Sequence, residues 1–385
     1  MAPSSSSVPQ QRKQILRFTS HRHLRQRLLL SLLSGKSIII SQIRPDDIHV
    51  GLRDYEINLL RLLERITNGS TVEISTTGTS FLFHPGLLPG GSYSHTCSLG
   101  RSIGYYLEVL VPLAPFCKKA FDISLFGITG EEGRDLTVDT IRTVTLPHLH
   151  IFGITENLEL QIKKRGAAPL GGGQVIFRCP VVRQLKTIQF IDKGKIKKIR
   201  GVAYSTRVSP QFANRMVESA RSVLNRFIPD IYLYTDVYKG EESGKSPGYG
   251  LTLVSQSTTS ALHSFESLST PPSESKTIQQ TPEDIALFSA RGLLEEINKG
   301  GCVDGKHQWL VLLLMALGKE DVGKCLMGDL TSHTIQFLRD MVIFFGVKFK
   351  LTPVQSDSIT EKTSTGEVMV SCVGIGYSNV NKSMA

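Results

Sequence analysis

The alternation of apolar and polar residues predicts a chain of mixed helices and strands. In residues 26–33 and 54–67 apolar side chains recur every three to four positions, which places them on one face of a helix. Residues 37–43 form an apolar run typical of a buried strand, and residues 71–75 and 80–84 alternate on either side of a turn. The first part of the chain therefore predicts two helices, a strand and a hairpin.

A second and a third group of elements follow a similar order. In the second group, the pattern predicts helices at residues 102–113 and 137–152 and strands at 121–128, 158–163 and 174–179. In the third, which begins at Pro282, it predicts helices at residues 283–297, 308–317 and 332–345 and strands at 324–327, 347–353 and 368–374. We predict an α+β fold in which three repeated units, each with two helices and a four-stranded sheet, form one large domain.

The stretch between the second and third groups breaks this pattern. It predicts strands at residues 186–191, 197–204, 231–238 and 251–256, and a helix that is capped by Ser209 and has Pro210 as its first residue. Residues 184–255 are interpreted as a small inserted α/β domain. Residues 256–281 are rich in Ser, Thr and Pro and are expected to form a flexible connection.

These boundaries assign residues 14–183 and 282–377 to the large domain and leave residues 1–13 and 378–385 as disordered tails. The longest apolar run spans residues 310–317 and is far shorter than the roughly 18 residues that cross a bilayer, so no membrane contact is expected. The chain has 44 Lys and Arg residues against 34 Asp and Glu residues, a net charge of +10. This balance favours a polyanionic partner such as RNA.

No spacing in the chain predicts a metal site. Six cysteines lie far apart and form no Cys-x-x-Cys pair, which is typical of reduced, buried thiols. His148 and His150 are two positions apart on a predicted helix, so their rings are expected to face different directions.

A glycine-rich segment lies between two predicted strands and ends in the triplet Gly171-Gly172-Gly173. Glycines let backbone N–H groups approach an anion closely, as in a phosphate-binding nest. The same triplet would also suit a hairpin turn that needs positive φ angles. Spacing alone leaves both interpretations open.

The segment resembles a motif of the RNA 3'-terminal phosphate cyclases, in which arginine-glycine, two residues, proline, one residue and three glycines follow in order. Arg165, Gly166, Pro169 and the glycine triplet match each of those positions. The helix pattern of residues 24–36 and the segments Ile43-Arg44 and Gly51-Leu52 also resemble that family, from about residue 18 to residue 377. The resemblance implies the fold of this family.

The segment that corresponds to the family's nucleophile departs from its pattern. Cyclases have valine-aspartate, one residue, a histidine that accepts AMP, and then an apolar helix. Val303-Asp304 and the apolar run are present, but Lys306 takes the histidine position and His307 lies one residue later. Because one residue rotates a helical side chain by about 100°, His307 is not expected to point where the family's histidine does.

Two other sites of the family's nucleotide chemistry also differ. The glycine-rich stretch before the first helix is replaced by Ser20-His21-Arg22-His23, and the glutamine-histidine pair by Tyr55-Glu56. The resemblance therefore implies that adenylation has been lost, with no catalytic residue and no cofactor.

Several basic residues remain as candidates for contact with RNA or phosphate, because a guanidinium presents a planar fork of donors to phosphate oxygens. The candidates are Arg22, Arg25, Arg44 and Arg165, with Gly171, Gly172 and Gly173. The alternative is a solvated surface with scattered ion pairs. A further basic ribbon could either follow a phosphate backbone or protect an edge strand from aggregation: Lys193, Lys195, Lys197, Lys198 and Arg200.

Arg339 and Asp340 lie on the last long predicted helix, and both side chains are expected on its exposed face. In the cyclase-like branch of the family, an arginine-aspartate pair on this helix resembles a docking site for a GTPase. The alternative is a surface charge pair that contributes only a few tenths of a kcal/mol.

The resemblance implies a non-catalytic ribosome-biogenesis factor of the small-subunit processome in the nucleolus of the nucleus. Such a factor supports early pre-rRNA cleavage for 18S rRNA maturation, as a monomer within a complex that contains a ribosome-assembly GTPase, pre-ribosomal RNA and a snoRNP. Two alternatives stay open. One is an active ATP-dependent cyclase that uses His307 through a shifted helix. The other is a pre-rRNA endonuclease, although no paired-carboxylate or histidine nuclease motif is present.

Overall fold

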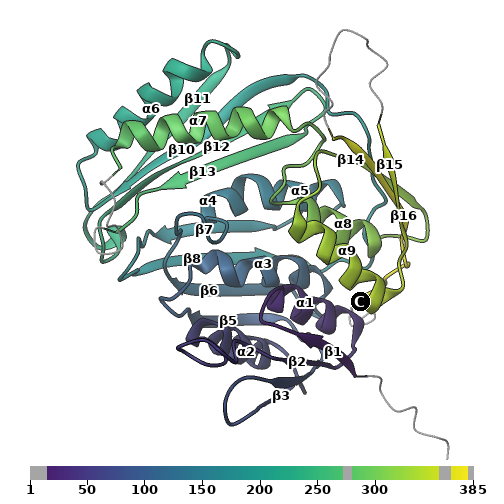
Figure 1. Cartoon of the computed structure of the whole chain (residues 1–385). Helices are drawn as coiled ribbons and strands as arrows, with labels where there is room; N and C mark the ends of the chain where they lie inside the picture. The colour runs from purple at the N-terminus through teal and green to yellow at the C-terminus, as the bar shows by residue number, and fades with distance from the viewer. Residues whose placement is uncertain (1–14, 272–279, 355–365, 380–385) are drawn as a thin grey trace, which may run out of the picture.

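Four four-stranded sheets with helices packed against them make up residues 15–271, 280–354 and 366–379, which a computed structural model describes (Figure 1). The prediction of a fold that mixes helices and sheets is confirmed. No helix in these residues is long and apolar enough to cross a membrane. All six cysteines are buried and free, as expected for reduced thiols.

The first sheet has the strand order β1-β2-β4-β3, in which β1 and β2 are parallel and the other pairs antiparallel. Its elements follow in the order β1 (Leu16–Thr19), α1 (Leu24–Ser34), β2 (Ile38–Ser41), α2 (Asp54–Ile66), β3 (Thr71–Ile74) and β4 (Phe81–His84). Leu28, Leu59 and Leu63 from the two helices are fully buried with Ile38 and Phe83 of the sheet. The apolar faces of both helices therefore pack against the sheet in one shared core.

The second sheet has the order β5-β6-β8-β7 with the same pattern of strand directions. Its elements are β5 (Gly91–Thr96), α3 (Ile103–Leu113), a 3-10 turn (Ala114–Phe116), β6 (Phe121–Gly127), α4 (Val138–Thr140), a π-helical turn (Ile141–Thr145), α5 (Leu146–Ile151), β7 (Glu159–Lys164) and β8 (Gly173–Cys179). The single helix predicted for residues 137–152 is therefore interrupted by a π-helical turn.

The third sheet has the order β15-β16-β14-β9, and again only the β9–β14 pair is parallel. Its elements are β9 (Gln189–Phe190), α8 (Gln308–Ala316), β14 (Val322–Met327), α9 (Ser332–Phe345), β15 (Phe349–Pro353) and β16 (Val368–Val373). The Thr331 hydroxyl accepts from the backbone N–H of Thr334 at the start of α9, and Gly346 ends the helix with a φ of 71°.

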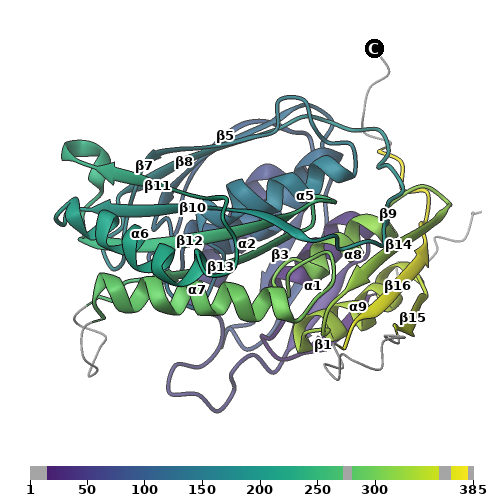
Figure 2. The same ribbon diagram turned by 90° about the horizontal axis from the view of Figure 1, so that it is seen from above.

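The fourth sheet has the order β11-β10-β12-β13, with two long helices against one of its faces (Figure 2). Its elements are β10 (Ile196–Thr206), α6 (Gln211–Leu224), β11 (Ile231–Tyr238), a 3-10 turn (Gly240–Ser243), β12 (Gly248–Ser257), β13 (Leu262–Leu268) and α7 (Pro282–Asn298). Helices α6 and α7 pack side by side against it and form a second core, separate from the large one.

Two predictions about this region were wrong. The helix predicted to open the third unit is α7, and its Ile285, Ala290 and Leu293 pack on Ile199 and Leu253 of the fourth sheet. The segment predicted as a flexible connection contains β13, which pairs with β12 along its whole length. Helix α7 lies on the fourth sheet because its apolar face is buried there. The segment of β13 forms a strand despite its polar composition because it pairs with β12.

The predicted strand at residues 186–191 was assigned to the inserted domain, but only Gln189–Phe190 forms a strand and it pairs with β14 of the third sheet. Within the basic ribbon only Arg200 lies where β10 is paired on both sides, because β11 pairs with β10 from Ile199 onward. Lys193 pairs with Glu367 at 2.7 Å, and Arg200 forms two hydrogen bonds with the carboxylate of Asp230. Lys197 and Lys198 lie on a part of β10 that has β12 on one side only, so both predicted roles of the ribbon stay open.

The predicted C-terminal tail begins too early, because Asn379 is buried. Its side-chain amide donates to the carbonyl oxygens of Cys117 at 2.9 Å and Val182 at 3.2 Å. The rest of that tail, the N-terminal tail at residues 1–13 and part of the predicted connection lie outside the described residues.

An ion pair joins α1 to α9 inside the large core. Asp340 was expected on the exposed face of α9, but it is buried and accepts from Nε of Arg27 at 3.3 Å and from the Gln336 amide at 2.9 Å. The Arg27 guanidinium also lies 4.4 Å from the centre of the Phe18 ring. Arg339 is exposed, so only one member of the predicted pair is available to a partner.

Asp340→Ala is expected to lower the free energy of unfolding by about 2–4 kcal/mol, because it leaves the buried Arg27 guanidinium without its carboxylate. Arg339→Ala, one residue away and exposed, is expected to change it by less than about 0.5 kcal/mol. Urea denaturation of both variants measures the difference. Equal stability of the two would show that the Arg27–Asp340 pair does not hold the helices together.

Candidate functional site

The segment that departs from the cyclase pattern lies at the start of α8, and its histidine is buried. The His307 ring Nδ1 lies 2.5 Å from Oδ1 of Asp304, and Nε2 lies 2.9 Å from the hydroxyl of Thr145. An ionised carboxylate only accepts, so Nδ1–H donates to Asp304, and Nε2 forms its hydrogen bond with the Thr145 hydroxyl. His307 is 1% exposed, and both ring nitrogens are used inside the protein.

Asp304 links this segment to the fourth sheet. Its Oδ2 accepts from the hydroxyl of Ser264 in β13 at 2.5 Å and from the Ser264 backbone N–H at 3.1 Å. Burial alone would raise the pKa of the Asp304 carboxyl, but His307 and Ser264 outweigh it and hold the pKa well below its usual range. Asp304 therefore stays ionised as a structural acceptor.

His148 stacks on His307, with ring centres 5.3 Å apart and planes 19° apart. Its Nδ1–H donates to the carbonyl of Val144 at 2.7 Å, and its other ring nitrogen is buried without a hydrogen bond. Burial, with the neighbouring His307, lowers the pKa of His148 to about 4. Thr145, His148 and Ser264 were not predicted as parts of this site, since nothing in their spacing relates them to residue 307.

Lys306, unlike the buried His307, lines a cavity of about 410 Å³. Its Nζ lies 2.9 Å from Oε1 of Glu266, whose other oxygen accepts from the hydroxyls of Thr137 and Thr140. Burial alone would lower the pKa of Lys306, but Glu266 outweighs it and raises the pKa above its ordinary value. The amine is therefore held as an ammonium ion.

Each basic residue named in the lining of this cavity already has a carboxylate partner. Arg25 pairs with Glu108 at 3.0 Å and Asp135 at 3.1 Å. The remaining pairs are Arg134–Glu131, Lys299–Glu296 and Lys306–Glu266. The positive charges in this lining are therefore balanced by neighbouring carboxylates.

Arg44 is committed to a partner that the family pattern lacks. Its two terminal nitrogens donate to the two oxygens of Glu56, both at 2.7 Å. Glu56 also accepts from the backbone N–H of Arg53 at 2.8 Å and so caps α2. The hydrogen bond with Glu56 raises the pKa of Arg44. The Tyr55-Glu56 departure thus changes Arg44 from a candidate anion ligand into half of a shielded ion pair.

Arg165 was predicted on an anion-binding surface and is instead fully buried. It donates two hydrogen bonds to Asp139, at 2.6 and 2.8 Å, and one to Asp236 at 3.1 Å. Its guanidinium lies 4.2 Å from the centre of the Tyr204 ring. This arginine joins the second and fourth sheets, so the four predicted arginines do not form one surface.

The glycine triplet packs against backbone rather than open space. A side chain at Gly172 would meet Gly244 and Lys245, and one at Gly171 would meet the backbone of Gly127. The backbone N–H of Lys245 donates to the carbonyl of Gly171 at 2.9 Å. Gly171 and Gly172 have φ angles of 60° and 85°, which agrees with the turn interpretation, and Gly173 begins β8.

Of the remaining candidates, Arg22 and Arg339 are exposed on different elements, before α1 and within α9. The described residues contain no group of three or more His, Cys, Asp or Glu side chains placed to hold a metal ion. His148 and His150 do face different directions, since one is buried and the other exposed.

The comparison with known proteins decides the family. The family model described as RNA 3'-terminal phosphate cyclase matches residues 16–351. This chain belongs to the RNA 3'-terminal phosphate cyclase family. It is 52% identical to the human RNA 3'-terminal phosphate cyclase-like protein over 363 residues, which cover 94% of this chain and 96% of the human protein. It is 44% identical over 373 residues to the rRNA processing protein rcl1 of Schizosaccharomyces pombe, covering 96% of this chain and 98% of that protein.

A third relative, the probable RNA 3'-terminal phosphate cyclase-like protein of Dictyostelium discoideum, is 48% identical over 378 residues, with 96% of this chain and 100% of that protein covered. The predicted resemblance to cyclase-like proteins is confirmed. Within this family, the chain combines an ammonium group at position 306 with a buried imidazole at position 307.

The lowered pKa of His148 predicts a loss of stability in acid. The unfolded chain binds a proton near pH 6.5, whereas the folded chain does so only near pH 4. Between these values the unfolded state holds more protons, so stability falls as the pH falls. From pH 7 to pH 5 the free energy of unfolding should drop by about 2 kcal/mol through His148.

His148→Phe is expected to remove that part of the pH dependence, while His150→Gln, which changes an exposed histidine two residues away, should retain it. Urea titrations at pH 7 and pH 5 measure both. The assignment fails if His148→Phe keeps the wild-type difference between the two pH values.

Proposed function

We propose that this chain is a non-catalytic ribosome-biogenesis factor of the nucleolar small-subunit processome. The proposal rests on its similarity to a fission-yeast protein named for rRNA processing and on a cyclase site without a usable nucleophile. In this role it supports early cleavage of pre-rRNA for 18S rRNA maturation, with a GTPase, pre-ribosomal RNA and a snoRNP as partners.

The geometry of residues 306 and 307 is the observation that carries the proposal. An amine attacks phosphorus only with a free electron pair, and the ion pair with Glu266 keeps Lys306 protonated. His307 would have to break its hydrogen bonds to Asp304 and Thr145 and leave the core before it could attack ATP. Neither side chain offers the activated nucleophile that adenylation needs.

The carboxylates near the cavity offer little support for a nuclease. A pair of carboxylates can bind catalytic metal ions or act as acid and base when at least one is free of cations. Asp135 is held by both Arg25 and Arg101, and Glu108 by Arg25. Their negative charge is compensated, so we favour a scaffold over an endonuclease.

The proposal also covers how the chain is divided into repeated units and an inserted domain. We infer that the three sheets with matching strand order are repeats of one unit, and that β10 to α7 is a domain inserted between β9 and α8 of the third unit. The inserted part then extends to Asn298, beyond the boundary expected from composition.

For the GTPase we propose the exposed face of α9. Arg339 lies there among three exposed apolar side chains at helical spacing, Ile335, Val342 and Ile343. An exposed apolar group around an arginine is typical of the centre of a protein interface. Asp340 supports this face from below through its pair with Arg27.

Incubation of the purified chain with radiolabelled ATP and Mg²⁺ is expected to leave no covalent AMP, and an RNA 3'-phosphate should remain uncyclised. Glu266→Gln, which removes the negative charge from beside Lys306, is included to test whether the amine can be activated. An AMP adduct on wild-type chain that disappears in Lys306→Ala or His307→Ala would overturn the non-catalytic assignment.

Expression of this chain in S. pombe depleted of rcl1 is expected to restore 18S rRNA, measured against the large-subunit rRNA by northern blot. Lys306→Ala should restore it equally, because no chemistry depends on the amine. Arg339→Glu should reduce both 18S rRNA and co-purification of the GTPase at least tenfold, since it places a repelling charge in the proposed interface.

Arg291→Glu makes the same charge change on an exposed position of α7 and serves as the matched control. If Arg339→Glu retains the GTPase as well as Arg291→Glu does, the docking surface lies elsewhere. Failure of the wild-type chain to restore 18S rRNA would contradict the proposed function itself.

A further inference from the structure

The two faces of the β10–β13 sheet have different neighbours. Helices α6 and α7 cover one face, and the other face is turned toward α4, the π-helical turn and β7 of the second sheet (Figures 1 and 2). On this second face lies a cavity of about 280 Å³ lined by Val202, Thr252 and Val254 of the sheet and by Thr143 of the π-helical turn. The cavity lies between the sheet and the π-helical turn.

Two tyrosines stand side by side in this cavity. Tyr232 and Tyr234 lie two residues apart on the edge strand β11, so both point to the same face, with Cα atoms about 6.6 Å apart. The register places Tyr232 beside Arg200 and Tyr234 beside Val202. The tyrosines are 60% and 52% exposed. Within the described residues neither ring stacks on another ring and neither hydroxyl forms a hydrogen bond.

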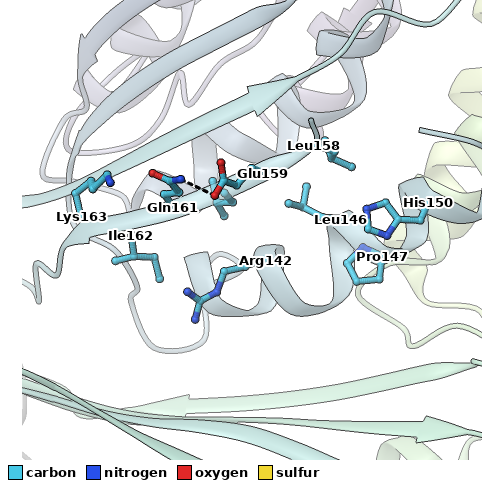
Figure 3. A pocket seen from close by; sticks show the side chains of 10 residues that line it. Arg142, Leu146, Pro147, His150, Leu158, Glu159, Gln161, Ile162 and Lys163 are labelled. Carbon is cyan, nitrogen blue, oxygen red and sulfur yellow. Dashed lines mark hydrogen bonds between the residues drawn. The ribbon is translucent and has the colours of Figure 1, made fainter. Parts of the chain in front are cut away.

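A second cavity, of about 470 Å³, lies between α5 and β7. Figure 3 shows Arg142, Pro147 and His150 extending from the helical side and Lys163 from the strand. Arg142 of this second cavity directly precedes Thr143 of the first cavity in the chain, and the two cavities share no lining residue. We name the cavity of about 280 Å³, with Tyr232 and Tyr234 in its lining, the tyrosine groove.

Basic residues outnumber acidic ones around the tyrosine groove. Arg142 uses one of its five N–H donors, in a 3.3 Å contact with Asp139. Lys163 is exposed. At the sheet end, Lys197 and Lys198 lie close enough to Asp230 to lower the pKa of its carboxyl together with Arg200, which contributes most. The acidic groups near the groove, Glu159 and Asp230, each pair with an arginine.

We propose that the tyrosine groove binds single-stranded RNA, with successive bases stacked on Tyr232 and Tyr234 and the phosphates along Arg142, Lys163, Lys197 and Lys198. This rests on the proposed role in rRNA processing and names the surface that contacts RNA. Exposed aromatic rings on a four-stranded sheet are a common platform for unpaired bases. A duplex keeps its bases stacked within itself, so it cannot use the tyrosines inside the groove.

The groove is distinct from the cavity that contains Lys306, since the two share no lining residue. RNA bound in the tyrosine groove would therefore not depend on the state of position 306. The sequence left the role of the basic ribbon open. In this proposal its Lys197 and Lys198, at the start of β10, bind phosphates at the end of the groove.

Fluorescence anisotropy with a fluorescein-labelled oligouridylate of about twelve nucleotides tests the proposal. Tyr232→Ala with Tyr234→Ala is expected to raise the Kd at least tenfold and to leave the salt dependence unchanged, because stacking and not charge is lost. Tyr232→Phe with Tyr234→Phe should stay within about twofold of wild type, since the rings are retained.

Two further variants separate stacking from charge and from general damage. Lys163→Gln should flatten the log–log salt slope by about 0.7, the loss of one phosphate contact on a single strand. Phe227→Ala removes an exposed aromatic at the end of α6, outside the groove, and should bind as wild type does. Thermal melting of every variant confirms that it is folded.

If the double alanine variant binds the oligouridylate with the same Kd as wild type, the tyrosine groove is not the RNA-binding surface. The proposed role in rRNA processing would be unaffected. Equal binding of a duplex of the same length would also overturn the proposal for the tyrosine groove. If the double alanine variant keeps its RNA affinity but loses the GTPase in fission-yeast extracts, the occupant of the groove is a protein. Restoration of 18S rRNA by a wild-type chain that binds no RNA would reject the groove but not the proposed function.

Discussion

The buried carboxylate of Asp304 is the constraint on which the arrangement of the sheets around α8 depends. It accepts from Ser264 of the fourth sheet and from both the backbone and the ring of His307, and that ring reaches Thr145 beside the second sheet. An ionised group inside a protein is tolerated only when its oxygens are satisfied. Each of these partners must therefore be in place for the start of α8 to be buried.

The same chemistry applies to basic residues that the family resemblance suggested as phosphate ligands or placed at the nucleophile position. Arg44, Arg165 and Lys306 each have a carboxylate partner in the described structure. A guanidinium that would hold a phosphate can hold a carboxylate with the same fork of donors. Glu56 thus holds Arg44 in a structural contact.

Most elements were predictable because their apolar residues repeat at the helix or strand period, as in α2, α9 and β8. The strand β5 was missed, since Gly91, Ser92 and Ser94 carry no apolar alternation and the strand is recognised only through its pairing with β6. The placement of α7 was wrong for a related reason. An amphipathic helix shows that one face is buried, but its periodicity does not say against which sheet.

The sequence by itself determined the family, the mixed fold and the replacement of histidine by Lys306, because these depend on the identity and order of residues along the chain. Only the tertiary structure decided that Arg165 and Asp340 are buried and that Glu56 forms an ion pair with Arg44. It also decided that Tyr232 and Tyr234 line a groove. The physical reason is that the ionic partners of Arg165 and Asp340 lie far away in sequence, at Asp139 and Arg27. Charge and aromatic character are local properties, whereas burial and pairing arise when distant segments meet.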